Sequence, residues 1–288
     1  MGSRTRNSLR VVAHVVTLFA VLAVGVRAAR AEQPRDWILG AQQPGTDLML
    51  DAILPGVQAT VEHRIPIYEI ANQLTLRANS LLLLPLYESQ ADVDLRLLVL
   101  TLGASAGFRD TFRNLTFAPG ERIDRDHRRQ RELDGRVSNE IWGFYEGRAT
   151  LSLPFNDYLV FQGVNTFRRE GRPERSYDWR NGVVHDGKLF RSDNMLFLKH
   201  RDWGGIAPIT QILDFQDGSN HITQVNYGVA LVTRPGARRR DDLLFVQVLF
   251  HPGKTLGDEN DSYGMHLLFS PIVVTVAYRA VLPISRPD

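Results

Sequence analysis

Apolar and polar residues alternate along several segments of the chain after residue 50. The clearest case is residues 57–67, where one face carries Val57, Ala59, Val61, Ile65 and Ile67, interrupted by His63. The other face carries Gln58, Thr60, Glu62 and Arg64. Because successive side chains of a strand point to opposite sides, this period of two predicts a half-buried strand.

Residues 140–153 and 223–231 repeat the pattern. In the first segment the apolar face is Ile141, Gly143, Tyr145, Gly147, Ala149, Leu151 and Leu153, and the opposite face is Glu140, Trp142, Phe144, Glu146, Arg148, Thr150 and Ser152. In the second, Thr223, Val225, Tyr227, Val229 and Leu231 lie opposite Gln224, Asn226, Gly228 and Ala230. Less regular strand-like segments are 74–84, 93–102, 159–168, 187–199, 205–215, 243–251 and 263–284, the last of which Pro271 could divide. The chain is therefore predicted to be all-β, with about ten strands and twelve as the alternative.

The predicted strands are joined alternately by short and long connections. Tight turns are expected around Glu88-Ser89-Gln90, Phe155-Asn156-Asp157, Arg201-Asp202-Trp203-Gly204 and Pro235-Gly236-Ala237. Long polar connections are expected over 113–138, 169–186 and 252–262, with shorter ones on the same side over 68–72 and 216–220. Short periplasmic turns and longer outer loops are typical of outer-membrane barrels.

In this pattern the chain resembles bacterial outer-membrane β-barrel proteins over about residues 55–284. The resemblance implies a Gram-negative source and an antiparallel up-and-down transmembrane β-barrel over residues 55–288, located in the cell outer membrane. It implies aromatic girdles, for which the candidates are Tyr68, Tyr87, Phe155, Tyr158, Phe167, Phe215 and Tyr263. It also implies outer-membrane lipid, the barrel-assembly machinery and periplasmic chaperones as partners. A soluble periplasmic β-sandwich or lipocalin-like binding protein would alternate in the same way and is the alternative.

Residues 1–31 have the features of a secretory signal peptide. Arg4, Arg6 and Arg10 precede an apolar stretch from Val11 to Val26, and Ala29-Arg30-Ala31 supplies a small-x-small cleavage site. The rival interpretation is an uncleaved anchor, but the apolar stretch is shorter than the roughly 20 residues that a membrane-spanning helix needs. We therefore expect cleavage after Ala31, a mature chain that starts at Glu32, and a periplasmic segment over residues 32–54.

Removing the signal peptide changes the charge of the protein. The full chain carries 34 Lys and Arg against 32 Asp and Glu, a net charge of +2. Residues 1–31 hold five arginines and no acid, so the mature chain has 29 basic and 32 acidic residues, a net charge of −3. This argues against a nucleic-acid partner, whose binding needs a basic face on the mature domain. The absence of cysteine excludes disulfides, zinc–thiolate sites and thiol nucleophiles.

One segment matches a catalytic motif. Gly103-Ala104-Ser105-Ala106-Gly107 fits the G-x-S-x-G nucleophile elbow and follows an apolar run. The elbow must lead into a helix, but residues 108–116 allow barely two turns before Pro119-Gly120. A serine hydrolase using Ser105 therefore remains a third hypothesis, behind a strand of small residues near the barrel rim, and no catalytic residue is assigned.

No metal or cofactor site is predicted. Gly253-Lys254-Thr255 lacks the glycine at position 248 that a phosphate loop needs, and residues 258–262 lack the glycine of an EF-hand, which leaves only a looser cation site open. The eight histidines form no H-x-x-x-H or H-E-x-x-H pair.

Two charged regions bear on function. The arginine-rich residues 121–136 are expected to form a solvated outer loop, with clamping of lipopolysaccharide phosphates as the alternative. Glu140, Glu146 and Arg148 are expected to point into the lumen, where salt bridges would plug a small barrel. The predicted function is a structural, transport or surface-contact role without catalysis, for which the sequence names no ligand and no oligomeric state.

Overall fold

The computed structural model describes residues 44–53, 56–67, 72–83, 86–115, 137–172, 176–178, 181, 183–200, 204–217, 220–233, 242–250 and 272–285. Within these residues, no helix is long and apolar enough to cross a membrane. Residues 1–43 lie outside the described part, so cleavage after Ala31 stays a prediction that intact-mass measurement of the mature protein can test.

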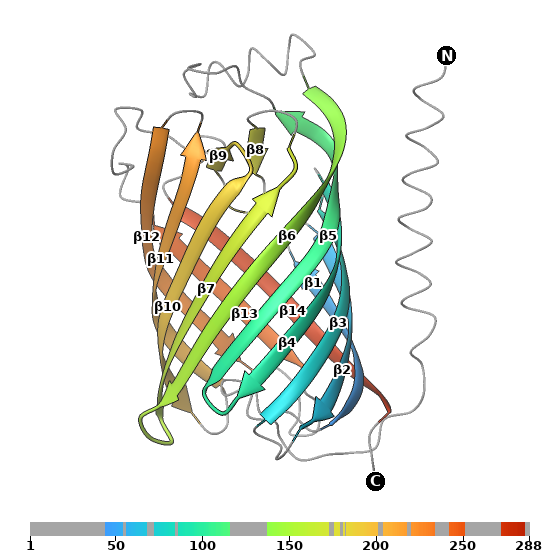
Figure 1. Ribbon diagram of the computed structural model, residues 1–288. Coiled ribbons are helices and arrows are strands. Elements are labelled where there is room, and N and C mark those ends of the chain that lie inside the picture. Colours follow the sequence, from blue (N-terminus) through green and yellow to red (C-terminus); the bar gives the residue numbers. More distant parts are fainter. Residues whose placement is uncertain are drawn as a thin grey trace.

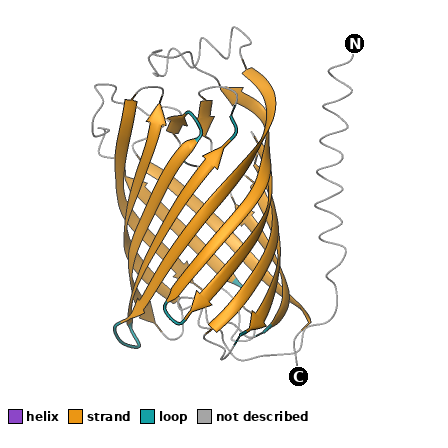
Figure 2. Cartoon of the chain, viewed as in Figure 1, coloured by secondary structure: helices purple, strands orange, loops and turns teal. Residues whose placement is uncertain are grey.

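Twelve antiparallel strands form a closed barrel (Figures 1 and 2). They are β1 (Gly45–Ile53), β2 (Gly56–Pro66), β3 (Asn72–Leu83), β4 (Leu86–Leu97), β5 (Leu100–Leu115), β6 (Val137–Pro154), β7 (Leu159–Glu170), β10 (Lys188–His200), β11 (Gly204–Asp217), β12 (Asn220–Thr233), β13 (Leu243–Phe250) and β14 (Ile272–Ser285). Neighbours in this order pair with one another, and β14 closes the barrel by pairing with β1. Two short strands, β8 (Ser176–Asp178) and β9 (Val183–His185), form a separate two-stranded sheet between β7 and β10.

The all-β antiparallel barrel is confirmed, and its strand number is the larger of the two expected. One additional strand is β1, so the barrel begins at Gly45 and not at residue 55. The other arises because the predicted strand 93–102 contains the end of β4 and the start of β5.

The β4–β5 turn carries no ordinary turn residue. It consists of Leu98 and Val99, and Leu98 has a φ of 54°, in the left-handed region that disfavours a branched side chain. The N–H of Leu98 donates to Asn72 Oδ1 at 3.1 Å, and Arg96 Nε donates to the Leu98 carbonyl at 3.1 Å. The predicted turn at Glu88-Ser89-Gln90 was wrong, because these residues lie inside β4.

The connections differ between the two ends of the barrel, as predicted. The end with the turns at residues 98–99 and 155–158 is called the turn end here. The opposite end, called the loop end, holds the long connections between β5 and β6, β7 and β10, and β13 and β14. The 216–220 connection is at the loop end as expected, whereas the 68–72 connection lies at the turn end because β1 reverses the direction of β2.

The alternation predicted from the sequence is confirmed in β2, β6 and β12. Val57, Ile141 and Tyr227 are exposed on the outer surface, at 42%, 50% and 51%. Glu62, Glu146 and Gln224 belong to the opposite rows, line the lumen and are buried. The exposed large apolar side chains of the strands all fall in the outward rows, so the outer surface of the barrel is apolar and its interior is largely polar.

The girdle candidates divide into two groups. Phe155, Tyr158 and Phe167 are exposed on the outside of the barrel. Phe215 is buried in the lumen, so its assignment to a girdle was wrong, whereas Tyr87 lies on the outward row of β4 and is also buried. The Tyr87 ring packs against Phe108 with 5.9 Å between centroids, and Phe215 belongs to an inward row of β11. Tyr68 and Tyr263 lie outside the described residues.

Candidate functional site

A row of residues that pair across neighbouring strands runs around the wall of the lumen. From β1 to β7 the row consists of Asp47, Glu62, Arg77, Asp92, Ser105, Glu146 and Arg168, each paired with the next across neighbouring strands. It continues over β10, β11 and β12 as Leu189, Phe215 and Ile222. The β1–β7 part of this row is therefore polar, and its β10–β12 part is apolar.

A first group of charges, called the central ion cluster, consists of Glu62, Arg77, Asp92, Asp94 and Arg148. Arg148 Nη2 donates to Asp94 Oδ1 at 2.7 Å and lies 3.9 Å from Asp92 Oδ1. Arg77 forms an ion pair with Asp94 and lies 3.6 Å from Glu62. Each arginine thus contacts two carboxylates, so the charges in this part of the lumen are largely neutralised.

Gly103 makes room for the central ion cluster. A Cβ atom at this position would lie 2.0 Å from Asp94 Oδ1 and 3.3 Å from Arg148 Nη2. On the same face of β5, a Cβ at Gly107 would lie 2.8 Å from the Phe144 ring. The small residues of the G-A-S-A-G segment therefore give clearance to larger side chains on β4 and β6.

A second group, called the loop-end ion cluster, consists of Glu88, Arg109, Arg168, Glu170, Arg172 and Asp178. Arg109 donates from Nε and Nη2 to Glu88 Oε2 at 2.9 and 2.7 Å, and from Nη1 to Asp178 Oδ1 at 3.0 Å. Arg168 Nη2 donates to Glu88 Oε2 at 2.8 Å and its Nε to Glu170 Oε1 at 2.6 Å. All these side chains are buried, and pairing offsets the cost of removing their charges from water.

Two aromatic rings complete the loop-end ion cluster. The Arg168 guanidinium lies 3.6 Å above the centroid of Phe144, and that of Arg172 lies 5.3 Å from the centroid of Trp142. The Trp142 indole N–H donates to Glu170 Oε2 at 3.1 Å. The aromatic residues Phe144 and Trp142 on the polar face of β6 are thus explained by their contacts with cations. These contacts stabilise the buried guanidinium groups.

The β8–β9 hairpin is held against the lumen wall. Asp178, at the end of β8, is the partner of Arg109 on β5. The Glu170 N–H donates to the Gly187 carbonyl at 2.7 Å, and the Asp186 N–H donates to the Gln216 carbonyl at 3.0 Å. Gly187 has a φ of 105°, which favours glycine. Contacts with β5, β7 and β11 thus hold the hairpin at the loop end, where Figure 1 places it.

Inside this hairpin, His185 is neutral by its hydrogen bonds. The Gly187 N–H donates to His185 Nδ1 at 3.0 Å, so Nδ1 carries no proton, and Nε2 lies 3.4 Å from Asp178 Oδ2. Burial lowers the pKa of His185, and Arg172 lowers it further. Burial alone would raise the pKa of Asp178, but Arg109 and the hydrogen bond to His185 hold it well below its usual range.

A cavity of about 200 Å³ lies within the lumen between the two ion clusters. Its lining is Glu146, Arg148, Val164, Thr166, Arg168, Asn181, Leu189, Arg191 and Asp193. Arg191 Nε donates to Asp193 Oδ2 at 2.6 Å and Nη1 donates to Asn181 Oδ1 at 3.3 Å. The side chains of Arg148 and Arg191 remain 24% and 30% exposed, so the cavity presents charged groups to its contents.

The opposite wall of the lumen is uncharged over much of its area. A chain of amides crosses it: Asn226 Nδ2 donates to Gln211 Oε1 at 2.9 Å, and Gln211 Nε2 donates to Asp193 Oδ1 at 2.9 Å. Nearer the turn end, a buried apolar cluster lies on the inward rows of β7 and β10–β13. It consists of Val160, Phe197, Ala207 and Val232, with Met195, Leu243 and Phe245 packed against it.

These features define the class of the protein. The barrel is closed and antiparallel, its outer surface is apolar, its lumen is polar, and its connections are longer at one end. Outer-membrane β-barrels share these features. The chain has the architecture of an outer-membrane β-barrel protein.

Comparison with known proteins adds the following findings. No protein-family model matches the barrel chain, and no curated protein matches it. Among solved structures, the NanC porin is similar with 11% identity and a TM-score of 0.39, covering 84% of this chain and 100% of that one. The KdgM porin is similar with 10% identity and a TM-score of 0.37, covering 84% of this chain and 99% of that one. Neither likeness extends beyond the general fold.

The residues singled out from the sequence have different locations in the barrel. Glu146 and Arg148 face the lumen as predicted, with 4.0 Å between Oε1 and Nη1. Ser105 lies in the middle of β5 opposite Asp92 and Glu146, away from any strand-to-helix turn and away from the rim. His63 is exposed on the outer surface, with Nδ1 2.8 Å from Thr46 Oγ1. Residues 121–136 and 258–262 lie outside the described residues, and the described ones contain no group of three potential metal ligands.

Sequence reasoning missed the residues of the loop-end ion cluster. Arg109 was considered only as part of a segment too short for a helix, and Glu170, Arg172 and Asp178 were assigned to a polar loop. A signal was present in β7. Its polar row of Gln162, Thr166 and Arg168 continues to Glu170, beyond the predicted end of the strand at 168. No comparable signal marks Asp178, whose partner Arg109 is 69 residues away.

Proposed function

We propose that the protein resides in the outer membrane and acts as a narrow channel for small polar solutes. The observation that carries this proposal is the lumen, where a polar cavity lies between two ion clusters inside a twelve-stranded barrel. A barrel of about eight strands is filled by its own side chains, whereas more strands leave interior space.

The outer surface supports placement in a membrane. Its outward rows carry exposed apolar side chains on every wall of the barrel, including Val93, Leu196 and Val274 at 48%, 37% and 58%. A soluble barrel would expose this surface to water, and soluble proteins rarely expose apolar patches of such extent. Inside a bilayer, the closed sheet leaves no unpaired backbone edge.

The width of the lumen limits what can pass. Side chains of the β8–β9 hairpin and of the loop-end ion cluster occupy the lumen toward one end, and the apolar cluster around Phe197 occupies it toward the other. A cavity of about 200 Å³ suits small ions or small polar molecules better than polymers. The plug of salt bridges expected for ten strands becomes, in twelve strands, a lining that surrounds a residual space.

Placement in the membrane is tested by cell fractionation with gel mobility of heated and unheated samples. We expect the mature protein in the outer-membrane fraction, with a mobility that shifts on heating because the folded barrel resists detergent. A freely soluble periplasmic product would contradict the proposal and favour the lipocalin-like alternative.

Channel activity is tested by single-channel conductance in planar bilayers made without lipopolysaccharide. Arg191→Gln removes a positive charge that lines the cavity and should shift the reversal potential toward cation preference. Arg169→Gln removes the same charge from the outer surface of the neighbouring strand and should leave the reversal potential unchanged. A wild-type protein without conductance above the protein-free bilayer, or equal shifts in the two variants, would contradict the channel.

A further inference from the structure

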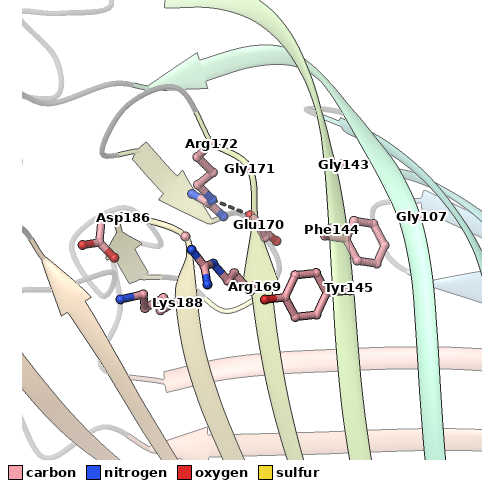
Figure 3. Close-up of a pocket in the computed structure, with 11 residues that line it drawn as sticks. Gly107, Gly143, Phe144, Tyr145, Arg169, Glu170, Gly171, Arg172, Asp186 and Lys188 are labelled. Atoms are coloured by element: carbon pink, nitrogen blue, oxygen red, sulfur yellow. Dashed lines mark hydrogen bonds and ion pairs between the residues drawn. The ribbon is translucent and has the colours of Figure 1, made fainter.

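A row of three exposed residues crosses the outer surface of the barrel near the loop end. Tyr145 on β6 pairs with Arg169 on β7, which pairs with Lys188 on β10. All three point outward, and Tyr145 is 52% exposed. Figure 3 shows Arg169 between Lys188 and Tyr145. Two cations and a phenol thus lie side by side on a surface that is otherwise mainly apolar.

This row lines a pocket of about 580 Å³ at the rim of the barrel. The rest of the lining is Gly107, Gly143, Phe144, Glu170, Gly171, Arg172, Asp186 and Gly187. Gly143 and Gly147 flank Tyr145 on the outward row of β6, and a Cβ atom at Gly147 would meet nothing within 4 Å. The absence of side chains at these two positions leaves the outer surface hollow on both sides of the tyrosine ring.

The charges around the pocket leave Arg169 and Lys188 available to a ligand. Glu170 and Arg172 form an ion pair with each other, which Figure 3 marks. Lys188 Nζ donates to the neutral Gln216 Oε1 at 3.3 Å, and Arg169 makes no ion pair with another described residue. Asp186 is the one exposed carboxylate in the lining, so it offsets only one of the two outward positive charges.

An aromatic row lies directly below the cations, toward the middle of the barrel. Phe167 and Phe190 pair with each other on β7 and β10, and they are 48% and 37% exposed. Each is two residues from its cation, a separation of about 7 Å along a strand. Girdles of aromatic residues flank the apolar band of an outer-membrane barrel, and long cationic side chains just beyond a girdle can reach the lipid phosphates.

We propose that Arg169, Lys188 and Tyr145 bind a phosphate group of lipopolysaccharide in the outer leaflet. The inference rests on the proposed function, because it requires that the barrel lies in the outer membrane with its loop end outward. Arg169 can donate two parallel hydrogen bonds to a phosphate, and Lys188 adds a second positive charge. The Tyr145 hydroxyl donates a further hydrogen bond, and the hollows at Gly143 and Gly147 accommodate the sugar or acyl groups next to the phosphate.

The test is a binding titration of the full mature protein, folded in detergent micelles, with bisphosphorylated lipid A. The same lipid without its phosphates and inorganic phosphate alone serve as the two reference ligands. We expect wild type to bind bisphosphorylated lipid A more tightly than either reference. The double variant Arg169→Gln, Lys188→Gln should lose affinity for it by about tenfold or more, because it removes two charge-assisted contacts.

The control variant lies at the other end of the same strand, on its inward row. Lys199 lies eleven residues from Lys188 on β10, about 37 Å along the strand, and its N–H donates to Tyr158 in a turn-end connection. Lys199→Gln should keep the wild-type affinity. Heat-modifiable gel mobility checks that each variant is folded, which we expect because Arg169 and Lys188 lie on the surface.

Three outcomes would overturn the proposal. They are equal binding of the two lipids by wild type, unchanged affinity of the double variant, and inorganic phosphate binding as tightly as the lipid, which would indicate a site for free phosphate. Failure of the channel proposal is detected separately, because conductance is measured without lipid A and through residues of the lumen.

Discussion

Gly103 and Gly147 show how much the two faces of one wall differ at the scale of single residues. They lie on the adjacent strands β5 and β6, with Gly103 facing the lumen and Gly147 facing outward. A Cβ at Gly103 would lie 2.0 Å from Asp94 Oδ1, whereas a Cβ at Gly147 would meet nothing within 4 Å.

The same substitution should therefore have opposite effects at the two glycines. Gly103→Ala forces Asp94 away from Arg148, and we expect it to lower the free energy of unfolding by about 1–3 kcal/mol, the cost of a poorly satisfied buried charge. Gly147→Ala should be neutral or stabilise by up to about 1 kcal/mol, since alanine costs less backbone entropy than glycine. Urea unfolding of the protein in lipid vesicles measures both, and equal midpoints would refute the clearance role of Gly103.

Ser105 illustrates what sequence alone could not decide at this scale. The G-A-S-A-G segment fits a nucleophile elbow as well as it fits a strand, because both need small residues. In the barrel the small residues provide clearance, because a side chain at Gly103 would collide with Asp94 and one at Gly107 with Phe144. Those neighbours come from β4 and β6, and no local pattern in β5 identifies them.

At the scale of elements, the strands with regular alternation were predictable and two others were not. β2, β6 and β12 carry mainly apolar side chains on their outward face and mainly polar ones on their lumen face, so their faces could be assigned from the sequence. β1 was missed because three consecutive apolar residues separate Asp47 from Asp51, so its alternation is irregular. The arginines that pair with these two aspartates belong to β2 and β14. β4 and β5 were merged because the turn between them is Leu98-Val99, held by Asn72 and Arg96.

The β8–β9 hairpin should respond to acid through His185. Its folded pKa is lowered below the usual value near 6.5, so the docked hairpin binds fewer protons than the released one below that pH. The contribution of neutral His185 to docking is complete above pH 6.5 and declines as the pH falls through that value. A protonated Nδ1 would also face the Gly187 N–H, which is a donor.

Limited proteolysis of the hairpin at several pH values measures its release. We expect cleavage near residues 179–182 to increase between pH 7.5 and 5 in the wild type. In His185→Gln this pH dependence should disappear. Asp178, whose pKa is held well below its usual range, stays ionised over the same interval, so its pairing with Arg109 should not contribute. A pH dependence retained by His185→Gln would exclude the histidine as its source.

At the scale of the whole molecule, the orientation of the wall relative to lipid can be measured directly. Leu151 and Ser152 are neighbours in β6, with Leu151 36% exposed outward and Ser152 buried on the lumen side, where Gln162 Nε2 lies 3.4 Å from its hydroxyl. A fluorescent probe on Leu151→Cys should be quenched by lipid-borne quenchers, and a probe on Ser152→Cys should not. The chain has no native cysteine to compete for the label.

The two positions also differ in their tolerance of charge. Leu151→Arg should reduce folding into vesicles more than Ser152→Arg does, by about 0–1 kcal/mol, because both lie close to the turn end and thus near an interface. Equal quenching at the two cysteines, or at neither, would show that this wall does not face lipid.

The seam between β1 and β14 has a consequence for how the chain reaches its native state. Arg279 donates from Nε and Nη2 to both oxygens of Asp51, at 2.6 and 2.9 Å, across a sequence separation of 228 residues. Contacts of such long range form late and slowly. Until the last strand has been made, the sheet has two open edges, which are prone to pair with other chains. A chain truncated before β14 would therefore keep both edges open, because β1 and β13 would have lost the strand that joins them.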